Sequence, residues 1–229
     1  NASIMFGTNQ ISPPIFGDGN ELNIVEIFPT LQGEGKYTGW PAVFIRLGNC
    51  NLACKFCDTE FEKFEQLQLS AIIEQVRQYS VNQQNERIAN LVVITGGEPF
   101  LQPIEALCQK LLADNFIVQI ETNGTLYREI PQAVDIICSP KMTNGKYLTI
   151  RDDLLKRITG LKFIISKDNY GYQDVEEVGQ GRYNIPVYVQ PMDEYDTDKN
   201  KQNLAYTVKL ALEQGYILSL QVHKIIGID

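Results

Sequence analysis

The sequence predicts an α/β fold, an incomplete (β/α) barrel of about six parallel strands. Short runs rich in Val and Ile, bounded by turn residues, recur along the 229-residue chain. Segments with a helical repeat of apolar residues alternate with them. Such alternation is typical of right-handed βαβ units and therefore of a parallel sheet or barrel. Six or seven parallel strands are too few to close an eight-stranded barrel.

Eight segments have the character of strands, and several are apolar almost throughout, as expected of parallel strands covered on both faces. In chain order they are residues 23–28, 42–47, 91–95, 116–121, 134–138, 161–165, 187–190 and 218–222.

Three segments have helical periodicity. The first carries Leu69, Ile72, Ile73 and Val76. The second follows Pro103, a residue suited to a first helical turn, and carries Ile104, Leu107, Cys108, Leu111 and Leu112. The third spans residues 198–214 and places on one stripe Leu204, Val208 and Leu212.

The composition limits the kind of protein. With 44% hydrophobic residues the chain can bury one substantial core, so we expect a single domain over residues 23–229 after an N-terminal extension over residues 1–22. The net charge of −8 argues against nucleic acid as the main partner. No apolar run of 18 residues and no secretory signal occur, which predicts a cytoplasmic protein without a membrane anchor. The odd number of cysteines, five, also fits a reducing compartment.

Unusual residues follow the predicted strands, at the carboxyl ends where ligands bind in such folds. They are Arg46 with the cysteine-rich loop after it, TGGEP (95–99), ETNG (121–124), SPK (139–141), QPMD (190–193) and HK (223–224). Their convergence predicts an active site.

The loop at residues 50–57 contains three cysteines in the spacing C-x3-C-x2-C. A structural zinc site takes four ligands, usually as two separate pairs, but Cys108 and Cys138 both lie in segments predicted to be buried. A zinc site would therefore have to recruit Cys138. A 4Fe–4S cluster normally takes four cysteines, so three thiolates leave one iron open to a small molecule. The predicted cluster ligands are Cys50, Cys54 and Cys57.

The TGGEP segment fits a ligand site next to this loop. Gly96 and Gly97 let the backbone approach a ligand without a Cβ clash, and Glu98 or neighbouring carbonyls can accept hydrogen bonds from an ammonium group. The alternative is an ordinary turn between a strand and a helix.

Seven segments, in order, resemble the 7-carboxy-7-deazaguanine synthases, a family of radical S-adenosylmethionine enzymes. They are TLQGEG (30–35), PAVFIRLGNCNLACKFCDTEF (41–61), VVITGGEP (92–99), QIETNGT (119–125), CSPK (138–141), VQPMD (189–193) and LQVHK (220–224). The resemblance runs from about residue 23 to the C-terminus. It implies a lyase that converts 6-carboxy-5,6,7,8-tetrahydropterin to 7-carboxy-7-deazaguanine with loss of ammonia, in the pathway to 7-deazapurines such as queuosine.

The resemblance also implies the cofactors, the partners and the roles of individual residues. The cofactors would be a 4Fe–4S cluster, S-adenosylmethionine and Mg²⁺; the partners would be a flavodoxin or ferredoxin as electron donor and a second copy of the chain. Cluster ligands would be Cys50, Cys54 and Cys57, and Mg²⁺ would bind Thr59. S-adenosylmethionine would contact Phe56, Cys57, Asp58, Gly97, Ser139, Pro140, Lys141, Gln190, Pro191, Met192 and Asp193. The substrate would contact Leu31, Gln32, Gly33, Arg46, Thr95 and Asp229.

Simpler roles stay open for several of these residues. Arg46 can pair with Glu34 or Glu60, and Thr59 can cap a helix or turn. Lys141 and Asp193 can be solvated loop charges. His223 can contact the pterin or a protein neighbour. The family often ends in proline where this chain has Asp229.

Two other functions compete with the synthase. A small radical activase that generates a glycyl radical on a partner protein shares the cysteine spacing, but TLQGEG and CDT indicate a dedicated small-molecule site. A non-catalytic iron–sulfur or zinc protein is the other possibility.

Overall fold

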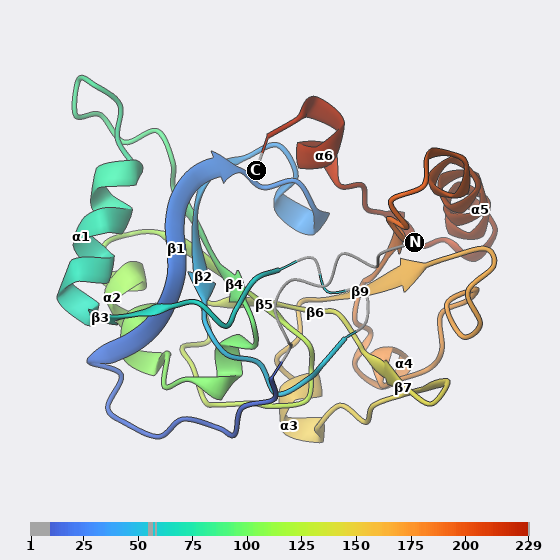
Figure 1. Ribbon diagram of the computed structural model, residues 1–229, viewed down its shortest axis with the longest axis horizontal. Helices are drawn as coiled ribbons and strands as arrows, with labels where there is room; N and C mark the ends of the chain where they lie inside the picture. Colours follow the sequence, from blue (N-terminus) through green and yellow to red (C-terminus); the bar gives the residue numbers. More distant parts are fainter. Residues whose placement is uncertain (1–9, 55–56, 58, 229) are drawn as a thin grey trace. The chain divides into compact units, whose positions relative to one another are not determined.

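The structure is a computed structural model that describes residues 10–54, 57 and 59–228 (Figure 1). Its internal contacts divide the chain into two compact units. The first unit comprises Asn1–Gln32, Trp40–Thr122 and Arg128–Asp135, and the second comprises Gly33–Gly39, Asn123–Tyr127 and Ile136–Asp229. The single domain expected over residues 23–229 stays a prediction.

The first unit holds a mixed sheet in the order β3-β1-β2-β4-β5. Its strands are β1 (Glu21–Leu31), β2 (Pro41–Leu47), β3 (Glu65–Gln68), β4 (Leu91–Gly96) and β5 (Ile117–Thr122). β2, β4 and β5 are parallel, whereas β1 is antiparallel to both of its neighbours. No crossover helix separates β1 from β2, and parallel pairing would need one.

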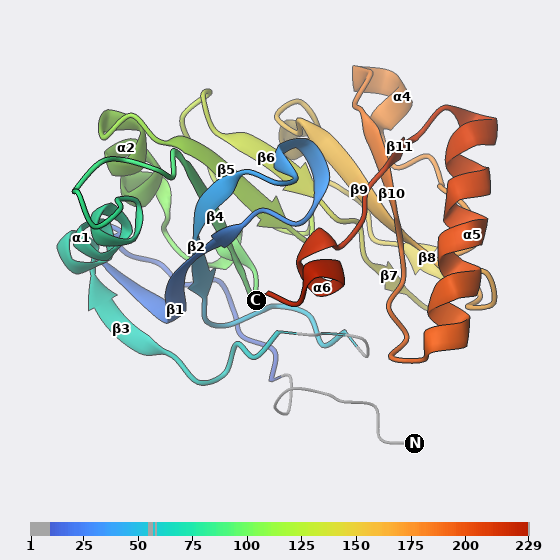
Figure 2. The same ribbon diagram turned by 90° about the horizontal axis from the view of Figure 1, so that it is seen from above.

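Two of the expected helices cover this sheet. They are α1 (Leu69–Tyr79) and α2 (Glu105–Ala113), and a 3₁₀ turn, η2 (Pro99–Leu101), precedes α2. α1 packs against β1 and α2 against β5, and the two helices also contact each other (Figure 2). The predicted apolar stripes are buried, including Ile72, Val76, Leu107 and Leu111. Both helices are therefore confirmed.

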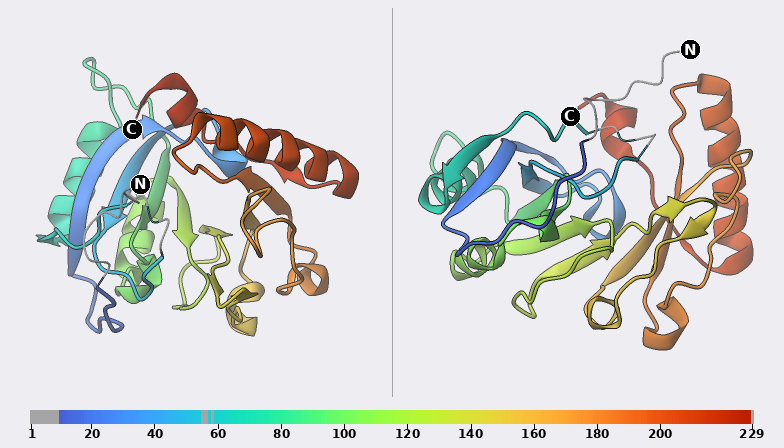
Figure 3. Two further views of the ribbon diagram at one scale, coloured as in Figure 1. Left: turned by 45° about the vertical axis from the view of Figure 1, so that its right-hand side comes forward. Right: turned by 60° about the horizontal axis from the view of Figure 1, so that its bottom comes forward.

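The second unit holds a parallel sheet in the order β6-β9-β10-β11. Its strands are β6 (Asp135–Cys138), β9 (Gly160–Ile165), β10 (Val187–Pro191) and β11 (Ile217–Leu218), and a separate hairpin is formed by β7 (Met142–Thr143) and β8 (Lys146–Tyr147). The helices are η1 (Gly35–Tyr37), α3 (Asp152–Leu155), α4 (Gln180–Tyr183), α5 (Thr197–Gln214) and α6 (Val222–Ile226). α5 lies along β10 (Figure 3).

The strand expected at residues 218–222 is mostly wrong. Only Ile217–Leu218 pairs as a strand, and Val222 already begins α6. The backbone N–H of Val222 donates to the carbonyl of Gly33 instead of to a sheet neighbour, at 3.0 Å. Gly227, with φ +71°, then ends the helix. His223 therefore lies on a short helix rather than directly after a strand.

α5 has the expected bounds but not the expected buried face. Leu204 and Leu212 are 41% and 82% exposed, while Asn203 and Thr207 are buried. The Asn203 amide accepts from the N–H of Lys167 at 2.9 Å and donates to the carbonyl of Met192 at 3.1 Å. These bonds compensate for burying a polar side chain. The stripe of leucines was thus the wrong face: the buried face of α5 consists of Asn203, Thr207, Leu210 and Ala211.

Replacing Asn203 with Ala is expected to lower the free energy of unfolding by about 1–3 kcal/mol, because the carbonyl of Met192 loses a buried hydrogen bond and the N–H of Lys167 loses its partner. Urea unfolding of the metal-free protein measures the change. The matched control is Leu204→Ala on the exposed face, expected to stay within about 0.5 kcal/mol of the parent. Equal losses in both variants would show that the leucine face is buried after all.

None of the helices in the described part of the chain is long and apolar enough to cross a membrane. The expected cytoplasmic location stays a prediction.

Candidate functional site

The cysteine loop begins where β2 ends. Asn49 adopts φ +67°, and its backbone N–H donates to the carbonyl of Phe61 at 2.8 Å, which closes the base of the loop. Cys50 is buried, whereas Cys54 and Cys57 are partly exposed. The N–H of Cys57 donates to the carbonyl of Cys54 at 3.2 Å. One loop therefore carries all three predicted cluster ligands.

The three thiols influence one another. Burial raises the pKa of the Cys50 thiol to about 12, and the charges of Glu98, Cys54 and Cys57 act in the same direction. Among residues 10–54, 57 and 59–228, no three His, Cys, Asp or Glu side chains form a group suited to a single metal ion. The buried thiol is therefore protonated at neutral pH, and a metal bound there would have to displace this proton.

The TGGEP segment is bonded directly to this loop. The N–H of Gly97 donates to the carbonyl of Leu47 at 2.9 Å, and the N–H of Glu98 donates to the carbonyl of Asn49 at 3.0 Å. A Cβ atom on Gly97 would lie 1.8 Å from the Asn49 carbonyl oxygen, and Gly96 has φ +110°. Only glycine allows this approach. The structure thus brings Gly97 to the cysteine loop, as the sequence predicts.

Glu98 is fully buried and does not point to solvent. Its carboxylate accepts from the N–H of Phe100 at 3.0 Å and from the hydroxyl of Thr122 at 2.7 Å. It therefore fixes the end of β5 to the turn after β4. The prediction that Glu98 or neighbouring carbonyls accept from an ammonium group stays a prediction.

Two predicted substrate contacts lie opposite each other in the first unit. Arg46 of β2 is in register with Thr95 of the parallel strand β4, and on its other side with Glu26 of β1. The Nε atom of Arg46 is 2.8 Å from Oε1 of Glu26. This N–H does not point at the carboxylate, so it has no hydrogen-bond acceptor among the described residues. The expected partners of Arg46, Glu34 and Glu60, are thus wrong, because pairing in the sheet places Glu26 next to it.

Gln32 takes part in a chain of polar side chains that the sequence did not single out. Its amide donates to Oε1 of Glu121 at 3.1 Å, and the amide of Gln119 donates to the same oxygen at 3.2 Å. Gln119 is fully buried. Gln119 and Glu121 in an otherwise apolar strand were a visible signal in the segment QIE, whereas Gln32 lies far from them in the chain.

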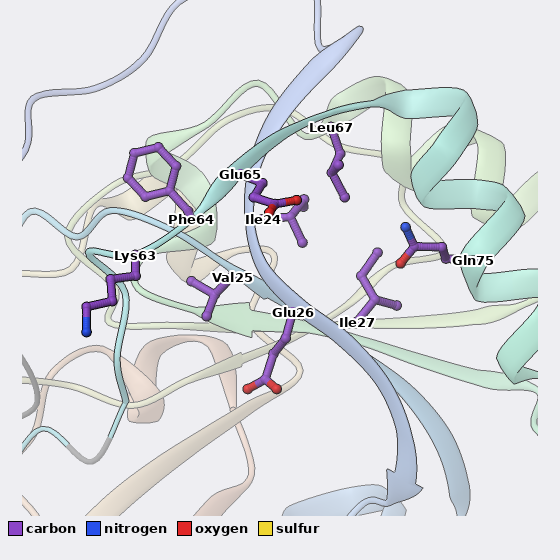
Figure 4. Close-up of a pocket in the computed structure, with 9 residues that line it drawn as sticks. All are labelled: Ile24, Val25, Glu26, Ile27, Lys63, Phe64, Glu65, Leu67 and Gln75. Atoms are coloured by element: carbon purple, nitrogen blue, oxygen red, sulfur yellow. The ribbon is translucent and has the colours of Figure 1, made fainter.

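An open hollow of about 470 Å³ lies beside the irregular pairing of β1 near Ile24 and Glu26. Figure 4 shows its lining, which comes from β1, β3, α1 and the residues before β3. None of the predicted site residues lines it. Glu26, which lines this hollow, is also the residue that pairs with Arg46.

In the second unit, Glu34 forms a buried ion pair with Lys162 on β9, and the amide of Gln221 donates to its other oxygen at 2.9 Å. Burial alone would raise the pKa of Glu34, but Lys162 and Gln221 outweigh it and lower this pKa to about 2. The predicted substrate residue Gly33 lies against His223, whose Nδ1 would be 2.0 Å from a Cβ at position 33. The sequence did not predict this pairing of Glu34 with Lys162.

The remaining predicted contacts in the second unit follow β6 and β10. Lys141 donates to the hydroxyl of Ser139 at 2.9 Å, so it is not simply a solvated charge. Gln190 accepts from the hydroxyl of Ser219 at 2.9 Å. Burial by itself would raise the pKa of Asp193. Hydrogen bonds outweigh this effect and lower the pKa of Asp193, and the strongest of them comes from Lys224 at 2.8 Å.

The remaining predictions concern the two other cysteines, the Mg²⁺ ligand and three residues that the structure does not describe. Cys108 and Cys138 are fully buried, as expected. The carbonyl of Thr59 lies 3.6 Å from the Cys57 sulfur, and the proposed Mg²⁺ role of Thr59 stays a prediction. Three predicted contacts lie outside the described residues: Phe56, Asp58 and Asp229.

Comparisons with known proteins agree with this geometry. Residues 44–162 match the radical SAM superfamily. A 7-carboxy-7-deazaguanine synthase from Rickettsia prowazekii is 54% identical over 229 residues, covering 100% of this chain and 98% of that protein. One from Rhodospirillum rubrum is 38% identical, covering 98% and 100%. The crystal structure of QueE from Escherichia coli has the same fold, with a TM-score of 0.68, 24% identity and coverage of 89% and 95%.

The structural match confirms the predicted fold class, and the match to the Rickettsia prowazekii protein covers the whole chain, including the cysteine loop, the TGGEP segment and the residues around Glu34. The chain belongs to the 7-carboxy-7-deazaguanine synthases of the radical SAM superfamily.

Proposed function

We propose that the chain is a radical S-adenosylmethionine lyase that converts 6-carboxy-5,6,7,8-tetrahydropterin to 7-carboxy-7-deazaguanine with loss of ammonia. The observation that carries the proposal is the cysteine loop, which supplies three thiols and whose base is joined to the TGGEP turn by the hydrogen bond from the N–H of Glu98 to the carbonyl of Asn49. Relatives that match over nearly their full length and are named 7-carboxy-7-deazaguanine synthase support the proposal.

The residues present fit an iron–sulfur cluster. One loop supplies three thiols, and Cys108 and Cys138, buried within α2 and at the end of β6, have the environment of core residues. Cys50, Cys54 and Cys57 would hold the cluster. When bound and reduced, the cluster supplies the electron that cleaves S-adenosylmethionine and so starts radical chemistry on the substrate. Gly97 would support this site by letting the main chain of the TGGEP turn pack directly against the base of the cysteine loop.

The polar residues of the first unit would bind and orient the substrate. Arg46 has a buried N–H without an acceptor among the described residues, and a substrate carboxylate or carbonyl would satisfy it. Its pairing with Glu26 places a negative charge beside the guanidinium before the substrate arrives. Glu121 would hold the amide of Gln32 in a fixed orientation. Thr95, in register with Arg46, offers a hydroxyl toward the same ligand.

Three parts of the proposal rest on the family alone. They are Mg²⁺ binding by Thr59, a homodimer, and electron transfer from a flavodoxin or ferredoxin. Thr59 would give Mg²⁺ one neutral oxygen, and substrate oxygens and water would complete its octahedral shell.

The proposal is tested by anaerobic turnover of the iron- and sulfide-reconstituted protein with dithionite, S-adenosylmethionine, Mg²⁺ and 6-carboxytetrahydropterin. Mass spectrometry is expected to detect 7-carboxy-7-deazaguanine. Cys54→Ala is expected to abolish both the brown colour and the product, because one cluster ligand is lost. Cys108→Ala, which removes a thiol from the core instead, is expected to keep both.

Formation of 5′-deoxyadenosine and methionine without a pterin-derived product would refute the substrate while leaving the radical chemistry in place. A colourless wild-type protein would refute the cluster.

A further inference from the structure

The N-terminal segment at residues 10–16 runs beside the cysteine loop, although it precedes all of the sequence motifs that suggested the family. Ile11 forms a parallel bridge with Cys50. The backbone N–H of Ser12 donates to the carbonyl of Cys50 at 2.8 Å, and the hydroxyl of Ser12 accepts from the amide of Asn49 at 3.2 Å. The segment thus bonds directly to the main chain of a predicted cluster ligand.

Both ends of the segment are fixed. The N–H of Gln10 donates to a carboxylate oxygen of Glu62 at 2.9 Å, beyond the far end of the cysteine loop. The N–H of Ile15 donates to the carbonyl of Leu101 in η2 at 2.7 Å. The segment therefore bridges the far end of the loop and the turn that follows TGGEP.

Arg128 stabilises the attachment of Ile15 to η2. Its guanidinium donates to the carbonyls of Ile15, Phe100 and Leu101 and lies 5.9 Å from the centre of the Phe16 ring. One side chain thereby joins the N-terminal segment to η2. A planar guanidinium with several fixed donors is suited to hold backbone carbonyls from separate segments.

Hydrophobic burial contributes little to the position of the segment, because among its large apolar side chains only Ile15 is partly buried. Ile11 is 62% exposed and Phe16 is 86% exposed, so neither gains much from its position. Directed hydrogen bonds hold the segment instead. Pro13 and Pro14 restrict the chain between the two attachments, which lowers the entropy lost when it is ordered.

We propose that residues 10–16 form a strap that holds the main chain of Cys50 and slows the opening of the cysteine loop, so that the cluster keeps its iron. The inference rests on the proposed cluster site. Cys50 is the buried ligand of the three, whereas Cys54 and Cys57 are partly exposed. Loss of iron requires the loop to open locally, and the rate of such opening depends on the bonds that must break first. The bond from Ser12 is one of these.

The first test uses Ser12→Pro, which removes the N–H that bonds to Cys50, and its matched control Ser12→Ala, which keeps this N–H. The anaerobic release of iron from the reconstituted protein to a chelator is followed by absorbance. We expect Ser12→Pro to release iron about tenfold faster, the effect of losing one hydrogen bond, and Ser12→Ala to stay within about threefold of the parent. Equal rates in Ser12→Pro and the parent would overturn the proposal.

A second test does not need the cluster. Backbone hydrogen exchange in the metal-free protein is expected to speed up over residues 49–54 in Ser12→Pro and in Arg128→Met, which releases the strap at its other end. Unchanged exchange in both variants would overturn the strap even if the proposed function holds. A parent protein that takes up no iron would instead refute the cluster, and the exchange result would still decide whether the strap exists.

Discussion

Lys162→Met is expected to lower the free energy of unfolding of the metal-free protein by about 3–5 kcal/mol, because it leaves a buried charge without its partner. The side chains of Lys162 and Glu34 are only 6% and 13% exposed. Gln221 donates to the other oxygen of Glu34, but an amide does not neutralise the charge. The loss is measured by urea unfolding at pH 7.

The same change is expected to reverse the pH dependence of stability. In the parent the pKa of Glu34 is lowered to about 2, below its unfolded value of 4.5. The ion pair therefore makes its full contribution to the stability of the folded state above about pH 4.5. This contribution is lost as the pH falls toward 2. Without Lys162, burial raises the pKa of Glu34, so the folded state binds a proton more tightly than the unfolded state. Lys162→Met should then gain stability as the pH falls from 7 toward 5.

Two variants separate this effect from a general loss of packing. Glu34→Gln combined with Lys162→Met removes both charges and is expected to recover much of the stability lost in the single variant. Lys209→Met breaks an exposed ion pair with Glu213 and is expected to change stability by less than about 0.5 kcal/mol. A single Lys162→Met variant that stays as stable as the parent and keeps its pH slope would contradict the buried pair.

Gly97→Ala is expected to prevent stable binding of the cluster and to abolish turnover. The added Cβ would lie 1.8 Å from the carbonyl oxygen of Asn49 and 3.2 Å from the backbone nitrogen of Cys50. Both are main-chain atoms, so relief requires the cysteine loop or the TGGEP turn to move. Overpacking of this kind typically costs about 1–3 kcal/mol.

Iron content after reconstitution and thermal unfolding of the metal-free protein measure the effect of Gly97→Ala. Gly17→Ala is the matched control, because its Cβ would lie 3.7 Å from the nearest atom, in ordinary contact with Pro103. Gly97→Ala could instead match the parent in both iron content and unfolding temperature. That result would show that the cysteine loop and the TGGEP turn can separate without loss of the site.

The sequence predicted the helices well where apolar side chains orient them. The stripe of α1 is buried as expected, since nothing polar competes for that face. In α5 the buried positions include Asn203 and Thr207, whose hydrogen bonds no periodicity of apolar residues can reveal. The short helix at Val222 was likewise missed, because its first N–H bonds to Gly33, a residue far away in the chain.

The sequence likewise predicted some residues of the candidate site and missed others. Local motifs identified the cysteines and Gly97, because their chemistry and spacing are informative by themselves. The partner of Arg46 was wrong, since strand pairing rather than sequence distance places Glu26 beside it. Lys162 is 128 residues from Glu34, and within the apolar run LKFII it gave no sign of a long-range partner.

The contact between Gly33 and His223 limits how these two positions can evolve. His223 occupies the space that any side chain at position 33 would need, with its Nδ1 2.0 Å from the site of a Cβ. A mutation at position 33 alone would push the imidazole away. A smaller residue at position 223 would have to come first, and that step would remove the only histidine of the chain. Among descendants of this protein, we therefore expect a side chain at position 33 only where position 223 has already changed to a smaller residue.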